Sequence, residues 1–104
     1  MKWTKNQIEE MNRRGFERDN DFYGMGPVYT KGAITLINDP DEIENVLESF
    51  DAGCRVCVMH RPKSKAKYMV YECEGDGYWL YSSFSAMMKA LPKIEREVYC
   101  VDDL

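Results

Sequence analysis

The segment KYMVYECEGDGYWLYSS, residues 67–83, carries the clearest evidence for the fold. Its two halves, KYMVYEC and GYWLYSS, are rich in the large aromatic residues that are common in β-strands. The tetrapeptide EGDG, which joins them and shares Gly77 with the second half, contains residues that tolerate positive φ, so it favours a short turn. The segment therefore predicts two antiparallel strands joined as a hairpin.

The residues on either side of this hairpin extend the predicted sheet. Directly before it, CRVCVMH (54–60) is a third strand-like run, and the short loop RPKSKA between them predicts a three-strand meander. AITLIN (33–38) is a short strand candidate, and REVYCVDD (96–103) is a last candidate at an edge. Residues 16–32 contain three glycines and one proline, so we expect a loop or a distorted edge segment there.

Two helices are indicated mainly by residues at their ends. Thr4 and Gln7 have the spacing of a capping box at the start of the first helix, and Gly15 is its expected stop. Ser83 is the expected cap of a short helix, SFSAMMKAL, near the end of the chain. Because proline lacks a backbone N–H, we expect Pro92 to close this helix.

A third helix, DPDEIENVLESFDAG (residues 39–53), has the clearest pattern. Asp39 is the expected N-cap, and Pro40 suits the first helical position. Four apolar residues follow the spacing i, i+3, i+4, i+7 and predict one buried stripe: Ile43, Val46, Leu47 and Phe50. Gly53 is the expected end of the helix.

The elements follow one another as α, β, α, β, β, β, α, β. One β-α-β unit followed by a meander predicts a single α+β domain over residues 1–104. We expect a mixed or antiparallel sheet of four to five strands, with a central three-strand meander and two to three helices packed on it. There is no signal-peptide pattern and no apolar run of about 18 residues, so we expect a cytoplasmic protein with no membrane partner.

The cysteines raise the question of a metal or redox site, because Cys54 and Cys57 have C-x-x-C spacing and His60 follows. Side chains alternate faces along a strand, so two residues three apart point to opposite sides and do not chelate one ion. The pair also follows a predicted helix C-terminus, where the helix dipole disfavours a thiolate. Cys73 and Cys100 stand alone. We therefore expect free thiols and no cofactor, with a zinc-binding module as an alternative.

No set of residues in the sequence indicates an enzyme. His60 is the only histidine, and any Ser–His or Cys–His nucleophile pair would require it. It stands beside Arg61 and Pro62 at the end of a predicted strand, which is typical of an exposed loop residue. We therefore expect no catalytic residues.

Charge is unevenly distributed along the chain, although the formal net charge is only −4. Residues 19–53 carry eight acidic groups and one basic group, whereas residues 54–71 carry five basic groups and no acidic one. This pattern predicts two surface patches of opposite sign. Nucleic-acid contact through the basic loop is an alternative function, and the residues concerned are Arg61, Lys63, Lys65 and Lys67.

The acidic patch favours a protein partner. Asp41, Glu44 and Glu48 form a row of carboxylates opposite the apolar stripe of the helix over residues 39–53. Such a row suits a basic surface on another protein and, in the extreme case, mimics a nucleic-acid phosphate backbone.

The predicted hairpin offers a second surface for a partner. Alternation along the strands assigns one face to Met69, Tyr71, Trp79 and Tyr81, and the other to Tyr68, Val70, Tyr78 and Leu80. If helices cover only one sheet face, the aromatic residues Tyr71, Trp79 and Tyr81 are exposed, and such residues dominate protein interfaces. If helices cover both faces, these aromatics belong to the core.

These patterns together favour a small non-enzymatic protein-binding domain that acts as an inhibitor or adaptor. Phage-borne inhibitors of host nucleic-acid-binding proteins are one class with this size and charge pattern. The partner is expected to be another protein, and a homodimer is a further assembly that the sequence leaves open.

Overall fold

The computed structural model describes residues 3–20, 27–39, 43–44, 46–47, 66–72 and 77–99. These residues contain five strands in one sheet, two helices, and short helical segments at 43–44 and 46–47. The helices are α1 (Lys5–Arg13) and α4 (Phe84–Tyr99). The strands are β1 (Glu17–Asp19), β2 (Val28–Lys31), β3 (Ile34–Ile37), β4 (Tyr68–Glu72) and β5 (Gly77–Tyr81). The chain is therefore a single compact α+β domain with the predicted number of strands and helices.

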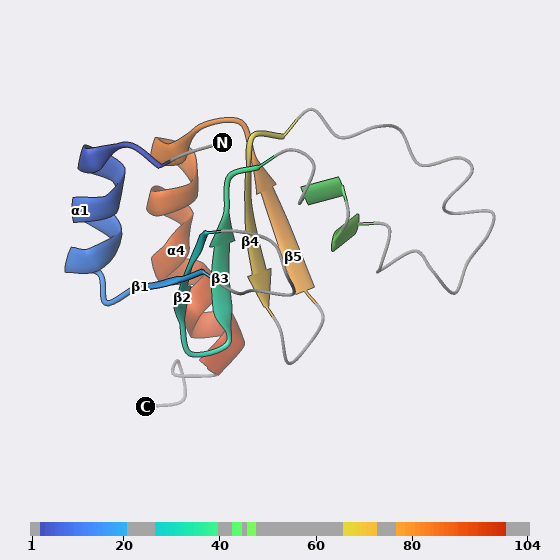
Figure 1. The fold of residues 1–104 in the computed structure, drawn as a ribbon. Helices are drawn as coiled ribbons and strands as arrows, with labels where there is room; N and C mark the ends of the chain where they lie inside the picture. Colours follow the sequence, from blue (N-terminus) through green and yellow to red (C-terminus); the bar gives the residue numbers. More distant parts are fainter. Residues whose placement is uncertain are drawn as a thin grey trace.

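The five strands lie in the sheet in the order in which they occur in the chain, β1-β2-β3-β4-β5 (Figure 1). Every neighbouring pair is antiparallel. The predicted β4–β5 hairpin is confirmed, but the other neighbour of β4 is β3. Both sides of β4 are thus occupied, so the expectation that residues 54–60 pair with β4 was wrong. Residues 54–60 themselves lie outside the described residues.

Residues 16–32, expected as a loop or a distorted edge segment, contain strands β1 and β2, and β1 lies at an edge of the sheet. β2 and β3 form a hairpin in which Lys31 pairs with Ile34, so its loop consists of Gly32 and Ala33. Gly32 has a φ of 59°, which glycine adopts without strain and which tight hairpin loops require. The sequence signal was weak because β1 has only three residues and no apolar alternation.

Helix α1 begins and ends as its sequence predicts. The Thr4 hydroxyl accepts a hydrogen bond from the Gln7 amide at 3.2 Å, and the Gln7 side chain accepts one from the Thr4 amide at 2.9 Å. This capping box satisfies two backbone donors that a helix N-terminus leaves unpaired. At the other end, Gly15 follows the C-cap residue Arg14 with a φ of 91°. Met11 is fully buried and anchors the helix in the core.

Helix α4 is longer than the sequence predicts. Ser83 caps it as expected, because its hydroxyl accepts a hydrogen bond from the Ala86 amide at 3.1 Å. Pro92, however, lies inside the helix, which continues to Tyr99. The expectation that Pro92 ends the helix was wrong, and so was the strand expected over residues 96–103 for its described part, 96–99. Leu91 and Ile94 on either side of the proline are buried, so packing outweighs the break in the backbone pattern.

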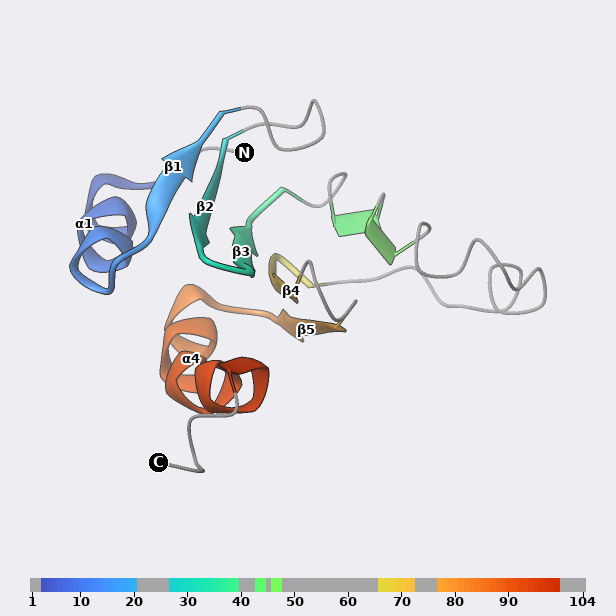
Figure 2. The ribbon, with the colours of Figure 1, turned by 90° about the horizontal axis from the view of Figure 1, so that it is seen from below.

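Two separate clusters of buried residues lie on the two faces of the sheet. The larger one joins the sheet to α1 and α4, which lie together on one side (Figure 2), and includes Met11, Phe16, Leu36, Val70, Met87 and Leu91. The smaller one joins the opposite face to residues 43–47 and contains Val28, Ile37, Ile43, Val46, Leu47 and Met69. The buried stripe predicted for the helix over residues 39–53 is thus confirmed at its three described positions. We call these faces the helix face and the outer face.

Candidate functional site

The pairing of β4 with β5 decides which side chains share a face. Met69 pairs with Leu80 and Tyr71 with Tyr78, so these four residues lie on one face. Met69 belongs to the smaller buried cluster, and Tyr71 packs against it, which identifies this as the outer face. The expected assignment, which grouped Tyr71 with residues 79 and 81, was therefore wrong.

The other residues of β5 lie on the helix face. Trp79 pairs with Val70 and Tyr81 with Tyr68. Trp79, Tyr81 and Tyr68 are all half-buried against the larger cluster under α1 and α4. The candidate residues Trp79 and Tyr81 consequently lie on the opposite side of the sheet from Tyr71.

Two residues that the sequence did not single out are the exposed large hydrophobic side chains of the described chain. Tyr78 is 37% exposed and Leu80 is 39% exposed, although their cross-strand neighbours Tyr71 and Met69 are half-buried and fully buried. The number of residues between β4 and β5 assigns these two side chains to a face of the sheet. Four residues separate Glu72 from Gly77, so each odd-numbered residue of β4 pairs with an even-numbered residue of β5. Tyr78 and Leu80 therefore share the face of Tyr71 and Met69.

Of the predicted acidic row, the structure describes Glu44. This residue is half-buried and lies between Ile43 and Val46, which pack on the outer face. The start of this helix agrees with Asp39 as N-cap, because the Ile43 amide donates to the Asp39 carbonyl at 2.9 Å. Asp41 and Glu48 lie outside the described residues.

The residues of the two alternative functions fall almost entirely outside the described residues. Lys67 is exposed, and its amide donates to the Tyr81 carbonyl at 3.2 Å. The remaining basic-loop residues and the possible metal ligands are not described: Arg61, Lys63, Lys65, Cys54, Cys57, His60, Cys73 and Cys100. Within the described part of the chain, no group of three His, Cys, Asp or Glu residues is placed to hold a metal ion.

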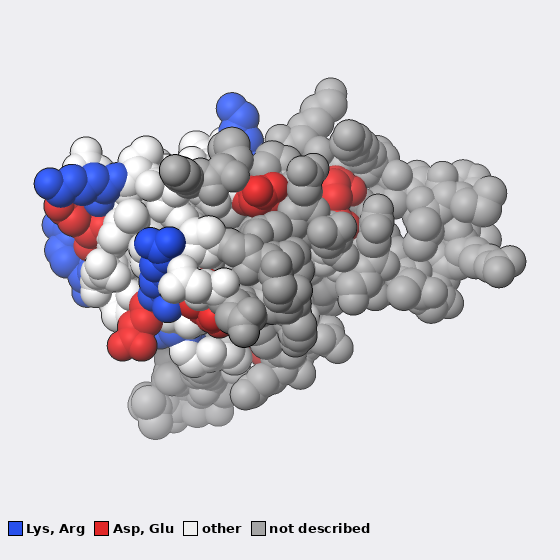
Figure 3. Space-filling view, in the orientation of Figure 1, with Lys and Arg blue, Asp and Glu red and all other residues white. Residues whose placement is uncertain are grey.

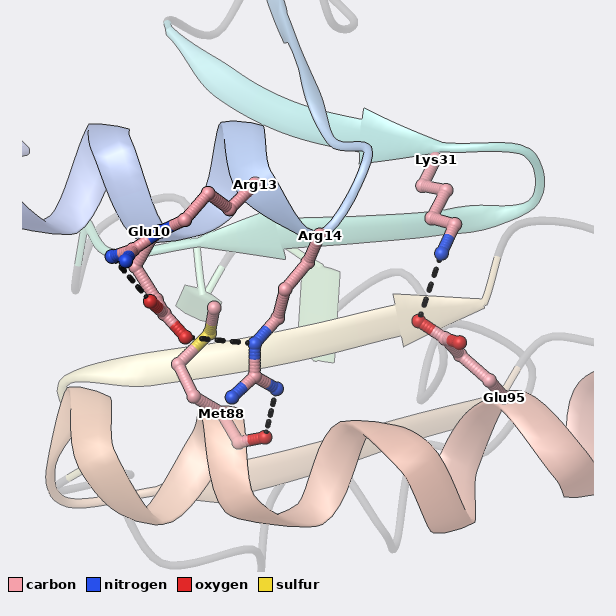
Figure 4. Close-up of polar contacts among 6 residues, drawn as sticks. All are labelled: Glu10, Arg13, Arg14, Lys31, Met88 and Glu95. Atoms are coloured by element: carbon pink, nitrogen blue, oxygen red, sulfur yellow. Dashed lines mark hydrogen bonds and ion pairs between the residues drawn. The ribbon is translucent and has the colours of Figure 1, made fainter.

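A second group of polar residues joins α1 to α4 (Figure 4). The Arg14 guanidinium donates through Nε to Glu10 at 2.9 Å and through Nη1 to the Met88 carbonyl at 2.5 Å. Glu10 also pairs with Arg13 at 2.7 Å. Farther along α4, Lys31 Nζ lies 3.5 Å from Glu95 Oε1. Basic and acidic groups alternate along this junction, so it is not a uniform basic patch.

Two shallow hollows of about 300 and 460 Å³ flank Arg14 at this junction. One is lined by Arg14, Lys31, Leu91, Pro92 and Glu95, and the other by Glu10, Arg14, Phe84, Ser85, Met88 and Lys89. In Figure 3, most of the Lys and Arg side chains visible on this side of the molecule lie over α1, with acidic side chains among them. The lining of each hollow contains two basic residues and one acidic residue, so neither hollow concentrates one sign of charge.

Tyr81 is the one described residue whose titration is clearly altered. Partial burial raises the pKa of its phenol above the usual value of 10.0, and the negative charge of Glu97 adds to the rise. Both causes disfavour the phenolate. Tyr81 is therefore neutral at physiological pH.

No protein-family model, curated protein or solved structure matches this chain. No helix among the described residues is long and apolar enough to cross a lipid bilayer.

Proposed function

We propose that this chain is a non-enzymatic protein-binding domain that acts as an inhibitor or adaptor, and that it docks through the outer face of β5. The single observation that supports this most strongly is the exposure of Tyr78 and Leu80, at 37% and 39%, on a paired strand. Side chains on a paired strand are held at a fixed spacing, so less conformational entropy is lost when they dock on a partner.

The surroundings of these two side chains support the same function. Tyr71 lies beside Tyr78 on the same face and is half-buried, so the exposed pair continues into a surface of large side chains. Tyrosine is enriched among the residues that carry most of the binding energy in interfaces. The helical residues around Glu44 pack on this same face, so the acidic helix and the exposed side chains of β5 would contact one partner together. The partner surface that fits is apolar with basic groups at its rim.

A pull-down with identification of the captured proteins by mass spectrometry tests this proposal. The protein is immobilised and exposed to a lysate of its native cell or host, beside a double variant, Tyr78→Ser with Leu80→Ser. We expect the wild type to retain a specific partner and the double variant to lose it while its unfolding free energy stays close to that of the wild type.

The control is Lys93→Ser, at an exposed position of α4, the helix that packs on the helix face, opposite the outer face that carries Tyr78. This control should capture the same partner as the wild type. Capture that is equal in the double variant would refute the proposed surface. Binding of the wild type to nucleic acid that weakens steeply with salt, and that Lys67→Glu reduces, would favour the alternative function instead.

A further inference from the structure

Three basic side chains of helix α4 lie in an exposed row. Lys89, Lys93 and Arg96 are all exposed and follow the spacing i, i+4, i+7, so they lie on one side of the helix within about 10 Å of its length. The buried side chains of α4 lie on its opposite side, in the cluster between the helix and the sheet (Figure 2). The row therefore points away from the sheet, and we call these three residues the basic row.

The two carboxylates of α4 lie on either side of the basic row and interact with the sheet. Glu95 Oε1 lies 3.5 Å from Lys31 Nζ on β2. The charge of Glu97 acts on Tyr81 of β5, whose pKa it helps to raise. None of the ion pairs in the described part of the chain involves the basic row.

The stability of α4 does not account for the basic row. Like charges at the spacings i, i+3 and i, i+4 repel each other and destabilise a helix. The helix dipole favours a cation in the last turn, which accounts for Arg96, but its effect falls off within one turn and does not extend to Lys89. Negative charge from another chain would offset the repulsion, so the row favours an acidic ligand.

The larger of the two hollows adjoins the basic row, because Lys89 belongs to both. Phe84 and Met88 give the lining of this hollow an apolar part. Arg14 and Glu10, in the same lining, form an ion pair at 2.9 Å and neutralise each other. The hollow therefore offers space of about 460 Å³ for an apolar side chain at one end of a row of positive charge.

We propose that the basic row and this hollow together bind an acidic segment of a partner protein. The carboxylates of the segment pair with the basic row, and one large apolar side chain enters the hollow against Phe84 and Met88. An acidic helix fits best, because it presents carboxylates at the same spacing as the row. The surface is separate from the outer face, so the chain would have one docking surface on each side of its sheet, as an adaptor requires.

A protein segment fits this surface better than nucleic acid does. The chain carries a net charge of −4, which repels a polyanion at long range. The basic row is one side chain wide, and Glu95 and Glu97 on its two sides would repel phosphates that lie outside it. A single helix with its carboxylates on one side avoids both groups.

The exposure of the basic row predicts how strong the binding is. Exposed ion pairs contribute little each, because water and salt screen them. We therefore expect weak binding of an isolated acidic peptide, with a strong dependence on salt. A partner that also contacts the outer face would bind more tightly through the two surfaces together.

An NMR titration of the isotope-labelled full chain tests the proposal. The probe is a synthetic alanine-rich helical peptide that carries one leucine followed by glutamates at the spacing of the basic row. We expect it to shift the amide signals of α4 around Lys89 and Lys93. A peptide with glutamine in place of each glutamate should shift none of them, and one with serine in place of leucine should bind more weakly. Salt raised from about 0.05 M to about 0.5 M should weaken the binding of the acidic peptide about tenfold.

Two variants of equal net charge distinguish the basic row from the charge of the whole chain. The first removes the row: Lys89→Gln, Lys93→Gln and Arg96→Gln. It should bind the acidic peptide about tenfold more weakly, because the exposed ion pairs are lost. The matched control removes the same charge at exposed positions elsewhere and should bind like the wild type: Lys5→Gln, Arg18→Gln and Lys67→Gln.

Several results would overturn the proposal. The absence of any shift in the α4 signals at millimolar peptide is one, and equal weakening in the two variants is another. Single-stranded DNA that shifts the same signals and binds more tightly than the peptide would make nucleic acid the ligand. Peptide binding that appears only with Asp102→Asn and Asp103→Asn would show that carboxylates of this chain occupy the row instead.

The titration and the pull-down on the outer face give independent answers. A captured protein that the Tyr78→Ser, Leu80→Ser variant loses and Lys93→Ser retains belongs to the outer face. A protein with the opposite dependence belongs to the basic row. Failure of the peptide titration would therefore leave the proposed docking through β5 standing, and loss of that docking would leave the titration result standing.

Discussion

Arg14 donates a hydrogen bond to the carbonyl oxygen of Met88, and this is the carbonyl that Pro92 leaves without its helical partner. In an α-helix the carbonyl of residue i accepts from the amide of residue i+4, and proline has no amide hydrogen. The same guanidinium donates through Nε to Glu10 Oε1 at 2.9 Å. The Arg14 side chain, at the end of α1, thus supplies the hydrogen bond that the Met88 carbonyl lacks because of Pro92. This bond helps α4 to continue past Pro92.

Replacement of Arg14 should destabilise the fold more than replacement of its neighbour. Arg14→Ala removes a charged donor from a part-buried carbonyl, which should cost about 1–2 kcal/mol in unfolding free energy. Arg13→Ala removes only a surface ion pair of a side chain that is 72% exposed and should cost about 0–0.5 kcal/mol. Urea unfolding of both variants measures the difference, and equal costs would show that the Met88 contact contributes nothing.

The contribution of Arg14 to the unfolding free energy should fall when residue 92 regains a backbone N–H. Pro92→Ala restores an amide that bonds the Met88 carbonyl, so α4 should gain about 1–2 kcal/mol from the removal of an interior proline. In this background Arg14→Ala should cost about 1 kcal/mol less than in the wild type. A double-mutant cycle by urea unfolding measures this coupling. Additive free energies would show that the Arg14 hydrogen bond to Met88 does not compensate for Pro92.

Gly15 should tolerate no side chain, whereas Gly77 should. Gly15 has a φ of 91°, and an added Cβ would lie 3.4 Å from Lys31 Cε, so Gly15→Ala should cost about 1–2 kcal/mol. Gly77 lies in β5 without a positive φ, and an added Cβ would make an ordinary contact with Trp79 at 3.5 Å. Gly77→Ala should therefore change the unfolding free energy by about 0.5 kcal/mol or less. Thermal and urea unfolding distinguish the two outcomes, and similar values for both variants would contradict this argument.

Tyr81 should make the fold sensitive to alkali. Its pKa is raised in the folded protein, first by burial and then by Glu97, so the folded state holds the phenolic proton more tightly than the unfolded state. Stability from this group is complete below pH 10 and is lost as the pH rises through 10 toward the folded pKa. Tyr81→Phe should reduce the loss of stability above pH 10, and Glu97→Gln should lower the Tyr81 pKa. Urea unfolding below and above pH 10 follows the first effect, and absorbance titration of the phenolate follows the second. An unchanged titration curve in Glu97→Gln would exclude the effect of that carboxylate.

The features that the sequence predicted well depend on interactions within a few residues. Thr4, Gly15 and Ser83 act on the turn of helix next to them, so their roles follow from spacing alone. Strand β3, the helical stripe around Ile43 and the β4–β5 hairpin follow from local periodicity in the same way.

The features that the sequence did not predict depend on residues far apart in the chain. The bond from Arg14 to Met88 spans 74 positions, and no local pattern marks Pro92 as a residue with an external donor. The pairing of β3 with β4 likewise joins residues more than 30 positions apart, such as Ile37 and Met69. The faces of Tyr78 and Leu80 are an exception, because they follow from a local count that the prediction did not use. An even number of residues separates Glu72 from Gly77, so Tyr78 and Leu80 share a face with Tyr71 and Met69.

The order of the strands has a consequence for how the chain folds. Each strand pairs with the next one along the chain, and β3–β4 is the pairing that encloses a long segment, residues 38–67. Local pairings form quickly, so β1–β3 and β4–β5 with α4 are expected to form first and to join in the slow step. Closure entropy grows only with the logarithm of loop length, at about 0.6 kcal/mol for each doubling. Insertions within residues 48–65, which leave the packed residues 43–47 intact, should therefore slow the joining of the two halves only slightly.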